Sequence, residues 1–218
     1  PPRIPDARRQ TLIVTESIFS MDGDPAPLRE IVALKEKYGA WLMVDEAHAT
    51  GLYGKNGRGF AEELGVSSRI EIQMGTLGKA LGASGGYICG SRPLIDILVN
   101  RARSFIFSTA PVPAAAATAT AGIQLIQSGE GKIRRDSLWR RVKQFNSKSA
   151  SAIIPLIIGG ETKAVELASR LREQNIYIPA IRYPTVARGT ARLRVTLTAT
   201  HKPEDVEELL AVLKSLNP

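Results

Sequence analysis

The sequence contains very little cysteine and histidine. Cys89 is the only cysteine, and the two histidines, His48 and His201, lie far apart. A single cysteine excludes disulfides within the chain and a multi-cysteine metal site, and two distant histidines disfavour a histidine-based zinc site. We therefore expect no metal. The cysteine usage indicates a reducing, intracellular setting, and we expect a cytoplasmic protein.

Long apolar runs, repeats and low-complexity segments are also absent. No apolar run approaches the length that crosses a membrane, and the 13 prolines and 19 glycines are spread along the chain. The first five residues, Pro1-Pro2-Arg3-Ile4-Pro5, contain no signal-peptide core. Because Pro1 rather than methionine stands first, we expect that a segment upstream has been removed. We expect no membrane partner.

Basic residues outnumber acidic ones, 29 to 21, which gives a net charge of +8. This charge suits an anionic partner. The basic residues are scattered, however, and form no run interleaved with aromatics, so we expect no nucleic acid. A polyphosphate small molecule such as coenzyme A would account for the charge, and a solvated surface accounts for it best.

Short apolar runs alternate with amphipathic stretches, a pattern typical of βαβ units on a mostly parallel sheet. We expect an α/β large domain over residues 1–128 and a smaller α+β domain over residues 129–218, because composition shifts near Ser128-Gly129-Glu130-Gly131. The predicted strands are 12–15, 41–44, 70–74, 86–90, 153–158, 176–181 and 193–197. The predicted helices are 28–38, 92–103, 113–127 (alanine-rich and expected to be buried), 132–145, 163–174 and 204–216. The join over 146–151 is unusually short, and we expect that a stretch is missing there or unobserved.

A carboxylate and a lysine follow two of the predicted strands. Asp45 ends the apolar run Trp41-Leu42-Met43-Val44, and Lys79 lies in a glycine-rich segment after the 70–74 strand. In open α/β sheets ligands bind beyond the carboxyl ends of strands. A lysine there can bond a cofactor aldehyde as a Schiff base, while a buried carboxylate keeps the ring nitrogen of the cofactor protonated. The alternatives are an aspartate that caps a loop and a solvated lysine.

Three further side chains could serve the same site. His48 follows Asp45 closely and could stack on an aromatic cofactor or bond its phenolic oxygen, or it could be a structural hydrogen bonder. Thr76 precedes Lys79 and could bind a phosphate with the backbone N–H groups of the turn, or cap a helix. Arg194 and Arg192 share one face of a predicted strand, where a guanidinium can grip a carboxylate; the alternative is a solvent-facing strand.

The chain resembles the α-oxoamine synthase family, which are pyridoxal 5'-phosphate (PLP) enzymes of the aspartate-aminotransferase fold (fold type I). Four motifs in order carry the resemblance, and they span nearly the whole chain. They are Thr15–Asp24, Val44-Asp45-Glu46-Ala47-His48, Gly75-Thr76-Leu77-Gly78-Lys79-Ala80-Leu81-Gly82, and Pro184-Thr185-Val186 with Gly189–Arg194 and Leu197–His201.

The resemblance implies the catalytic residues Lys79, Asp45 and His48. It implies that Lys79 carries PLP, that Asp45 pairs with the ring nitrogen, and that Ser20 and His48 contact the phenolic oxygen. Thr76 would take the phosphate, with Ser108 and Thr109 reaching it from the second subunit of a homodimer. Thr185 and Arg194 would hold the substrate.

The implied reaction is a decarboxylative condensation of an amino acid with an acyl-coenzyme A or acyl-carrier thioester. Lys79 would remove the α-proton of the amino acid, the carbanion would attack the thioester, and loss of carbon dioxide would give an α-amino ketone. Ala180-Ile181-Arg182-Tyr183-Pro184-Thr185 most resembles the members that join L-alanine to a pimeloyl thioester in biotin synthesis. Glycine C-acetyltransferase, 5-aminolevulinate synthase and serine palmitoyltransferase types share most motifs and are the alternatives.

The family carries a long N-terminal region that has no counterpart in these residues. We therefore expect a longer parent protein. A non-catalytic member of the fold is a second hypothesis, which the presence of Lys79 disfavours. A nucleic-acid binder ranks far behind, because no groove-reading motif is present.

Overall fold

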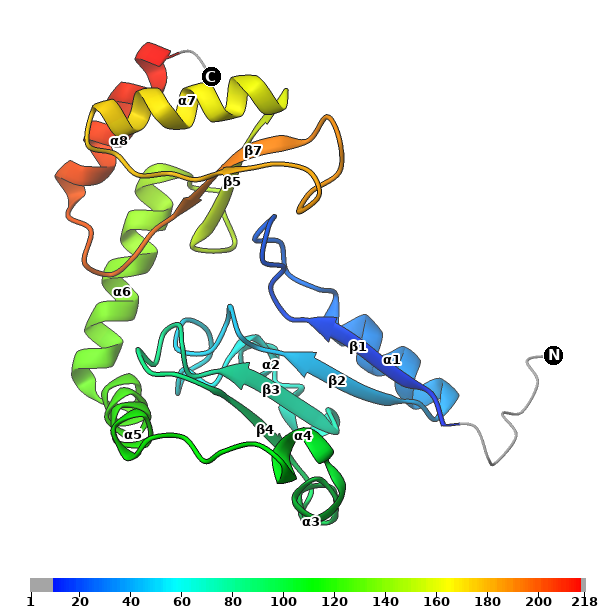
Figure 1. Ribbon diagram of the computed structural model, residues 1–218. Coiled ribbons are helices and arrows are strands. Elements are labelled where there is room, and N and C mark those ends of the chain that lie inside the picture. Colours follow the sequence, from blue (N-terminus) through cyan, green and yellow to red (C-terminus); the bar gives the residue numbers. More distant parts are fainter. Residues whose placement is uncertain (1–9, 217–218) are drawn as a thin grey trace. The chain divides into compact units, whose positions relative to one another are not determined.

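The computed structural model describes residues 10–216, which form two compact units (Figure 1). The first unit contains residues 10–18 and 26–131, and the second contains residues 19–25 and 132–216. The short segment 19–25 thus groups with residues that follow it by more than a hundred positions. Assignment of PLP binding to residues 1–128 and of a small domain to 129–218 stays a prediction.

The first unit is built on a four-stranded sheet of β1 (Leu12–Glu16), β2 (Trp41–Asp45), β3 (Ile72–Thr76) and β4 (Gly86–Gly90), in that order. The first three strands are parallel, and β4 is antiparallel to β3. This arrangement confirms the predicted α/β class with a mostly parallel sheet. The third strand begins and ends two residues later than predicted, so that its last residue is Thr76.

Helices α1 (Leu28–Tyr38) and α2 (Phe60–Glu63) pack on one face of this sheet. Leu42 and Val44 alternate along β2 with residues of the opposite face, and they are fully buried against Leu28 and Val32 of α1. Helix α1 ends as predicted, because Gly39 adopts the left-handed conformation with φ 62°. A 3₁₀ turn, η1 (Ser67–Arg69), leads into β3.

The remaining helices of the first unit are α3 (Arg92–Arg101), α4 (Arg103–Ile106) and α5 (Pro113–Gln127). The predicted helix 92–103 breaks at Ala102, whose ψ of 104° is extended. The prediction that 113–127 is buried is wrong, since Ala119 is the only buried residue of α5. Alanine favours a helix whether or not the helix is covered, so an alanine-rich run indicates helix and not burial.

The second unit holds a three-stranded antiparallel sheet, β5 (Ile153–Gly159), β7 (Ala191–Thr196) and β6 (Ala180–Ile181), in that order. The same unit contains helices α6 (Gly129–Phe145), α7 (Glu161–Glu173) and α8 (Pro203–Leu216). The first residues of α6 still belong to the first unit. Buried residues such as Leu167, Leu193 and Val206 form its core. This is the predicted smaller α+β part.

The sequence led us to expect a strand over 176–181 and a missing stretch in the short join over 146–151. The predicted strand 176–181 is wrong over most of its length, because only Ala180 and Ile181 pair with β7. Pro179 has no N–H to donate to a ladder, which shortens the strand. The short join after α6 is made by a turn in which Ser149 Oγ donates to Ser151 O at 2.8 Å. No helix among residues 10–216 is both long and apolar enough to cross a membrane.

Candidate active site

Two of the predicted site residues lie at the carboxyl edge of the parallel strands. Asp45 ends β2 and Thr76 ends β3. Asp45 is paired in register with Met74, so Thr76 stands two residues farther along the neighbouring strand. The sheet therefore delivers both residues to the edge where α/β proteins bind ligands.

The Asp45 carboxylate keeps acceptor capacity for a ligand. Its Oδ1 accepts a hydrogen bond from the N–H of Ala47 at 2.8 Å, which fixes the start of the following turn. Within the described chain this is the only hydrogen bond that its side chain receives. A carboxylate has two oxygens and about four lone-pair sites, so a second donor can still bind. The loop-capping alternative is thus correct and leaves room for a ligand contact.

Lys79 and His48 are in direct contact. Nζ of Lys79 lies 2.8 Å from Nε2 of His48. Lys79 is exposed in the connection between β3 and β4, and His48 is half-buried in the turn after β2. The fold therefore joins an amine and an imidazole from segments that are separated by a helix and a strand, beside the strand that ends at Asp45.

Thr76 organises the turn that carries Lys79. Its Oγ donates to Gly85 O at 3.2 Å and accepts the N–H of Gly78 at 3.1 Å. No helix begins between β3 and β4, so the alternative of a helix cap is wrong. Gly82 has φ 63° and open space where a Cβ would point, which leaves the turn accessible on that side.

Glu46 is an important residue that the sequence analysis missed. It is 1% exposed and accepts hydrogen bonds from Ser17 Oγ at 2.6 Å and from the N–H groups of Phe60 and Ala61 at 2.9 and 2.8 Å. Burial raises the pKa of this carboxyl, and the three donors oppose the rise only in part. Glu46 thereby anchors the turn between Asp45 and His48. Nothing in the sequence distinguishes it from a solvated glutamate.

The other end of the same turn is held by Tyr87 of β4. The Tyr87 hydroxyl lies 2.8 Å from Thr50 Oγ, which donates to Glu46 O at 3.1 Å. The ring lies across Gly75, where a Cβ would meet the hydroxyl at 2.5 Å. Burial raises the pKa of Tyr87, which keeps the hydroxyl protonated. The turn that presents His48 is therefore fixed from both sides.

Three predicted site residues belong to the second unit: Ser20, Thr185 and Arg194. Arg194 Nε donates to the carbonyl oxygen of Ser20 at 2.7 Å, and its Nη1 donates to Thr196 Oγ at 2.9 Å. Burial lowers the pKa of Arg194. Thr185 is exposed, with its N–H bonded to Arg182 O at 3.0 Å.

Arg192 has a structural role on the same strand. It is 6% exposed, and its Nη1 donates to Asp22 and to Met21 O. Both arginines thus reach the 20–22 segment, as strand alternation predicts. The alternative of a solvent-facing pair is wrong for Arg192.

Ser108 and Thr109 lie apart from this cluster. Both are exposed in the connection between α4 and α5, and neither side chain bonds to Asp45, His48, Thr76 or Lys79. Across residues 10–216, no three histidine, cysteine or acidic side chains are grouped so that they could hold a metal ion.

Comparison with known proteins gives consistent matches along the chain. The model of the family described as aminotransferase class I and II matches residues 3–213. The 8-amino-7-oxononanoate synthase of Geobacter sulfurreducens is 48% identical over 212 residues, which cover 93% of this chain and 54% of the relative. That of Bordetella petrii is 45% identical over 222 residues, covering 97% and 56%. The chain thus spans about half the length of these relatives.

Solved structures are similar to it as well. A serine palmitoyltransferase of Sphingomonas wittichii matches with a TM-score of 0.92 at 33% identity, covering 97% of this chain and 56% of that one. A high-resolution structure of SPT with a PLP internal aldimine has a TM-score of 0.92 at 29% identity, covering 96% and 55%. An 8-amino-7-oxononanoate synthase of Francisella tularensis has a TM-score of 0.82 at 26% identity, covering 97% and 64%.

Proposed function

The chain belongs to the aminotransferase class I and II family, and on this premise we propose that its protein catalyses a PLP-dependent decarboxylative condensation. The substrates are L-alanine and a pimeloyl thioester, and the product is 8-amino-7-oxononanoate of biotin synthesis. The names of the relatives at 43–48% identity support this choice. The contact between Lys79 and His48, beside the strand that ends at Asp45, is the observation that carries the proposal.

The residues at the carboxyl edge fit PLP. The site offers an amine in Lys79, a carboxylate with a vacant lone pair in Asp45, and a threonine hydroxyl in Thr76, whose hydrogen bond to Gly85 O a phosphate oxygen would replace. These match the aldehyde, the pyridine nitrogen and the phosphate of the cofactor. When bound, PLP supplies an electron-poor ring that stabilises a carbanion at the α-carbon of an amino acid.

Within this site the amine of Lys79 would bond the cofactor and, once the incoming amino acid has displaced it, would remove the α-proton of that amino acid. His48, whose Nε2 lies 2.8 Å from this amine, would exchange a proton with it and, with Ser20, would contact the phenolic oxygen. Asp45 would keep the ring nitrogen protonated. Thr76 would bind the phosphate, and Ser108 and Thr109 would reach the phosphate of the other subunit in a homodimer.

The substrate is held by the second unit. Arg194 uses Nε and Nη1 in hydrogen bonds within the protein, which leaves Nη2 to donate to the substrate carboxylate in this proposal. Thr185 is the second substrate contact in this proposal. The protein acts in the cytoplasm on an amino acid and an acyl-coenzyme A or acyl-carrier thioester.

A second candidate is a condensation with a different amino acid. The serine palmitoyltransferase structures, at a TM-score of 0.92, support this alternative. A product assay decides between the two. The protein is incubated with PLP, pimeloyl-coenzyme A and L-alanine, glycine or L-serine in turn, and the ketone is identified by mass spectrometry.

We expect 8-amino-7-oxononanoate and one equivalent of carbon dioxide with L-alanine, and no product from the Lys79→Ala protein. A faster reaction with glycine or L-serine would favour the alternative. No ketone with any amino acid or acyl donor would support the non-catalytic hypothesis.

A further inference from the structure

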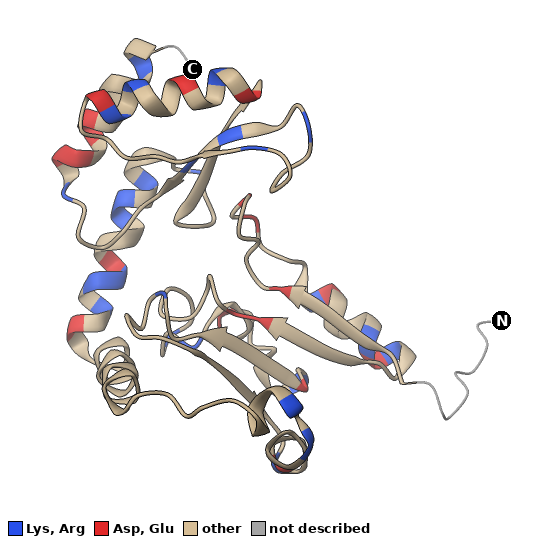
Figure 2. Ribbon diagram, in the orientation of Figure 1, with Lys and Arg blue, Asp and Glu red and all other residues tan. Residues whose placement is uncertain are grey.

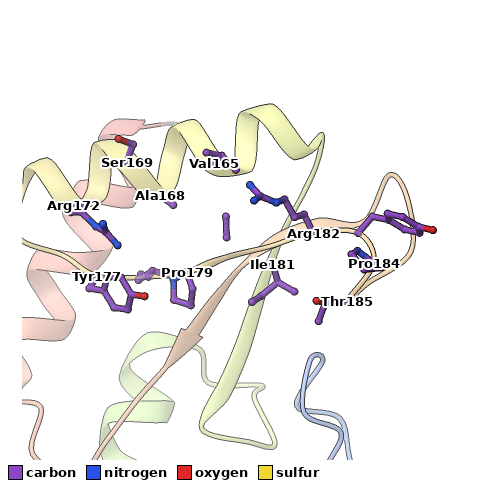
Figure 3. Close-up of a pocket in the computed structure, with 13 residues that line it drawn as sticks. Val165, Ala168, Ser169, Arg172, Tyr177, Pro179, Ile181, Arg182, Pro184 and Thr185 are labelled. Carbon is purple, nitrogen blue, oxygen red and sulfur yellow. The ribbon is translucent and has the colours of Figure 1, made fainter.

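Tyr87 differs from three other tyrosines of the chain in the part of its side chain that makes the contact. A lysine or arginine lies over the ring, at 5.4, 4.9 and 4.0 Å from its centroid, in Tyr38, Tyr177 and Tyr183. Figure 3 shows one of these rings, Tyr177, at the groove beside α7. The hydroxyl of Tyr87 instead lies 2.8 Å from Thr50 Oγ. It therefore joins β4 to the turn that follows β2.

The Tyr87 ring can reach this turn because the strand between them has a glycine. Tyr87 and Gly75 are partners in the antiparallel register of β4 and β3. A Cβ on Gly75 would meet the Tyr87 hydroxyl at 2.5 Å, so the ring lies over β3 at this position. A side chain at position 75 would displace the ring from Thr50.

The ring lies on the face of the sheet that is opposite to the Asp45 carboxylate. Side chains alternate along a strand, and Val44, which precedes Asp45, is buried against α1. In the register of β2 and β3, Gly75 faces the same way as Val44, and Tyr87 shares that face. A ring paired with Asp45 would therefore lie away from Tyr87. Any effect of Tyr87 on the reaction must pass through its contact with the turn.

The two hydroxyls donate in a fixed order. Thr50 Oγ has one proton, which it donates to the carbonyl oxygen of Glu46 at 3.1 Å. Tyr87 is therefore the donor in its contact with Thr50. Figure 2 shows acidic residues at the ends of β1 and β2. Burial raises the pKa of Tyr87, and the charges of Glu46 and Asp45 add to the rise, so the hydroxyl keeps the proton that it donates.

These hydrogen bonds close a ring of contacts around the proposed site. The Glu46 carbonyl oxygen accepts two N–H groups of the turn, at 2.9 and 2.8 Å, besides the Thr50 hydroxyl. His48 lies within this turn, and its Nε2 is 2.8 Å from Nζ of Lys79. Lys79 is carried by the connection that leads into β4, the strand of Tyr87. The Tyr87 hydroxyl thus ties the segment that carries Lys79 to the turn that carries His48.

We propose that Tyr87 is a positioning residue for the proton exchange between His48 and Lys79. Through Thr50, its hydroxyl holds the imidazole within hydrogen-bond distance of the amine, where a proton can pass between the two nitrogens. Neither hydroxyl gains or loses a proton in this step. The inference rests on the roles that the proposed function gives to His48 and Lys79.

The imidazole NMR signals of the protein without PLP test the positioning directly. Only His48 and His201 give such signals, and the His48→Gln protein assigns them. The Lys79→Met protein shows where the His48 signals lie once the contact is lost. At one fixed pH, we expect the His48 signals to move toward that position in Tyr87→Phe and in Thr50→Val. They should stay at the parent position in Thr50→Ser, which keeps the hydroxyl, and the His201 signals should not move.

Tyr38→Phe is the matched control, because it removes the hydroxyl of an exposed ring on α1. It should leave the His48 signals and the condensation unchanged. In the condensation assay Tyr87→Phe should lower kcat about tenfold, with the KM for the amino acid and the affinity for PLP within about twofold of the parent, since it affects proton transfer and not binding.

His48 signals that stay at the parent position in both Tyr87→Phe and Thr50→Val would overturn the proposal. An equal movement in Tyr38→Phe, or an unchanged kcat in Tyr87→Phe, would also overturn it. The NMR measurement needs no cofactor, so the two failures can be told apart. A parent protein that makes no ketone, while its His48 signals follow the variants as expected, would refute the proposed function alone.

Discussion

Among single residues, the buried carboxylate of Glu46 supports the proposed site without belonging to it. It receives three hydrogen bonds and lies between Asp45 and His48 in sequence. Its backbone carbonyl also accepts Thr50 Oγ, which continues to Tyr87. The distance between His48 and Lys79 therefore depends on a side chain that would contact neither cofactor nor substrate.

Replacement of this side chain has a defined expected cost. Glu46→Ala leaves the Ser17 hydroxyl and two backbone N–H groups buried without an acceptor, and we expect a loss of about 3–5 kcal/mol in the free energy of unfolding. Urea denaturation measures it. Glu166→Ala, on an exposed face of α7, is the control and should stay within about 0.5 kcal/mol of the parent. Equal effects of the two changes would refute the anchoring role.

A second carboxylate gives the fold a pH dependence. Glu71 Oε1 lies 2.5 Å from Nζ of Lys35, whose side chain is 7% exposed, and Glu71 Oε2 accepts the N–H of Leu42 at 2.8 Å. Although burial acts to raise the pKa of Glu71, these bonds lower it below 4.5 overall. The pair thus contributes stability that is complete above pH 4.5 and is lost as the pH falls through the lower, folded-state pKa.

We expect Glu71→Gln to lose about 2 kcal/mol at neutral pH, because it leaves the buried Lys35 charge without its partner. The difference from the parent should shrink as the pH falls below 4.5 and through the lower, folded-state pKa of Glu71, because the carboxylate that pairs with Lys35 is then protonated. Urea denaturation across this pH range measures it. Glu36→Gln, which breaks the exposed contact with Arg69, should change little at any pH. A loss for Glu71→Gln that is independent of pH would contradict the assignment.

At the residue scale the sequence points to the residues of the proposed chemistry and not to the residues that support them. Asp45, His48 and Lys79 stand out because each follows a strand pattern or lies in a glycine-rich turn. Glu46, Ser17 and Tyr87 do not, because their role arises from burial and from partners that are distant in sequence. No single-residue pattern contains that information.

At the scale of elements, the turn after β2 packs directly on the turn that holds Lys79. Gly51 has φ 85°, and a Cβ there would lie 2.7 Å from the Cβ of Ala80. Only glycine satisfies both the backbone conformation and the close approach. The two turns therefore fit together only when this position has no side chain.

Gly51→Ala is expected to destabilise the protein by about 2–4 kcal/mol, from left-handed strain together with overpacking. It should also weaken PLP binding, because Ala80 is adjacent to Lys79. Gly39→Ala isolates the strain, since Gly39 has φ 62° and nothing within 4 Å of a Cβ. We expect it to cost about 1 kcal/mol and to leave PLP affinity unchanged. Thermal unfolding and cofactor titration of both variants make the comparison, and equal effects on PLP affinity would contradict the packing argument.

Element prediction from sequence succeeds where one pattern decides the outcome. Helix α1 has an apolar stripe and a terminal glycine, and β2 is a short apolar run that ends at a charged residue. Prediction fails where contacts with other elements of the fold decide whether a segment pairs or is buried. Residues 176–179 have strand-like composition but no ladder, and α5 has a buried-looking composition but little covering it among the described residues.

At the scale of the whole molecule, the residues of the proposed reaction are divided in the chain between the two units. Asp45, His48, Thr76 and Lys79 belong to the first unit, and Ser20, Thr185 and Arg194 belong to the second. The composition of the sequence changes near residue 128, and this change predicts a domain boundary there. It cannot predict that residues 19–25 group with the second unit, since that depends on Arg192 and Arg194 reaching Met21, Asp22 and Ser20.

The attachment of PLP to Lys79 tests the central claim most directly. The protein is incubated with PLP, reduced with borohydride and digested, and the modified peptide is sequenced by mass spectrometry. We predict a single modified lysine, Lys79, and no modification in the Lys79→Ala protein. Modification of a different lysine, or no modification under conditions where the protein is folded, would contradict the account.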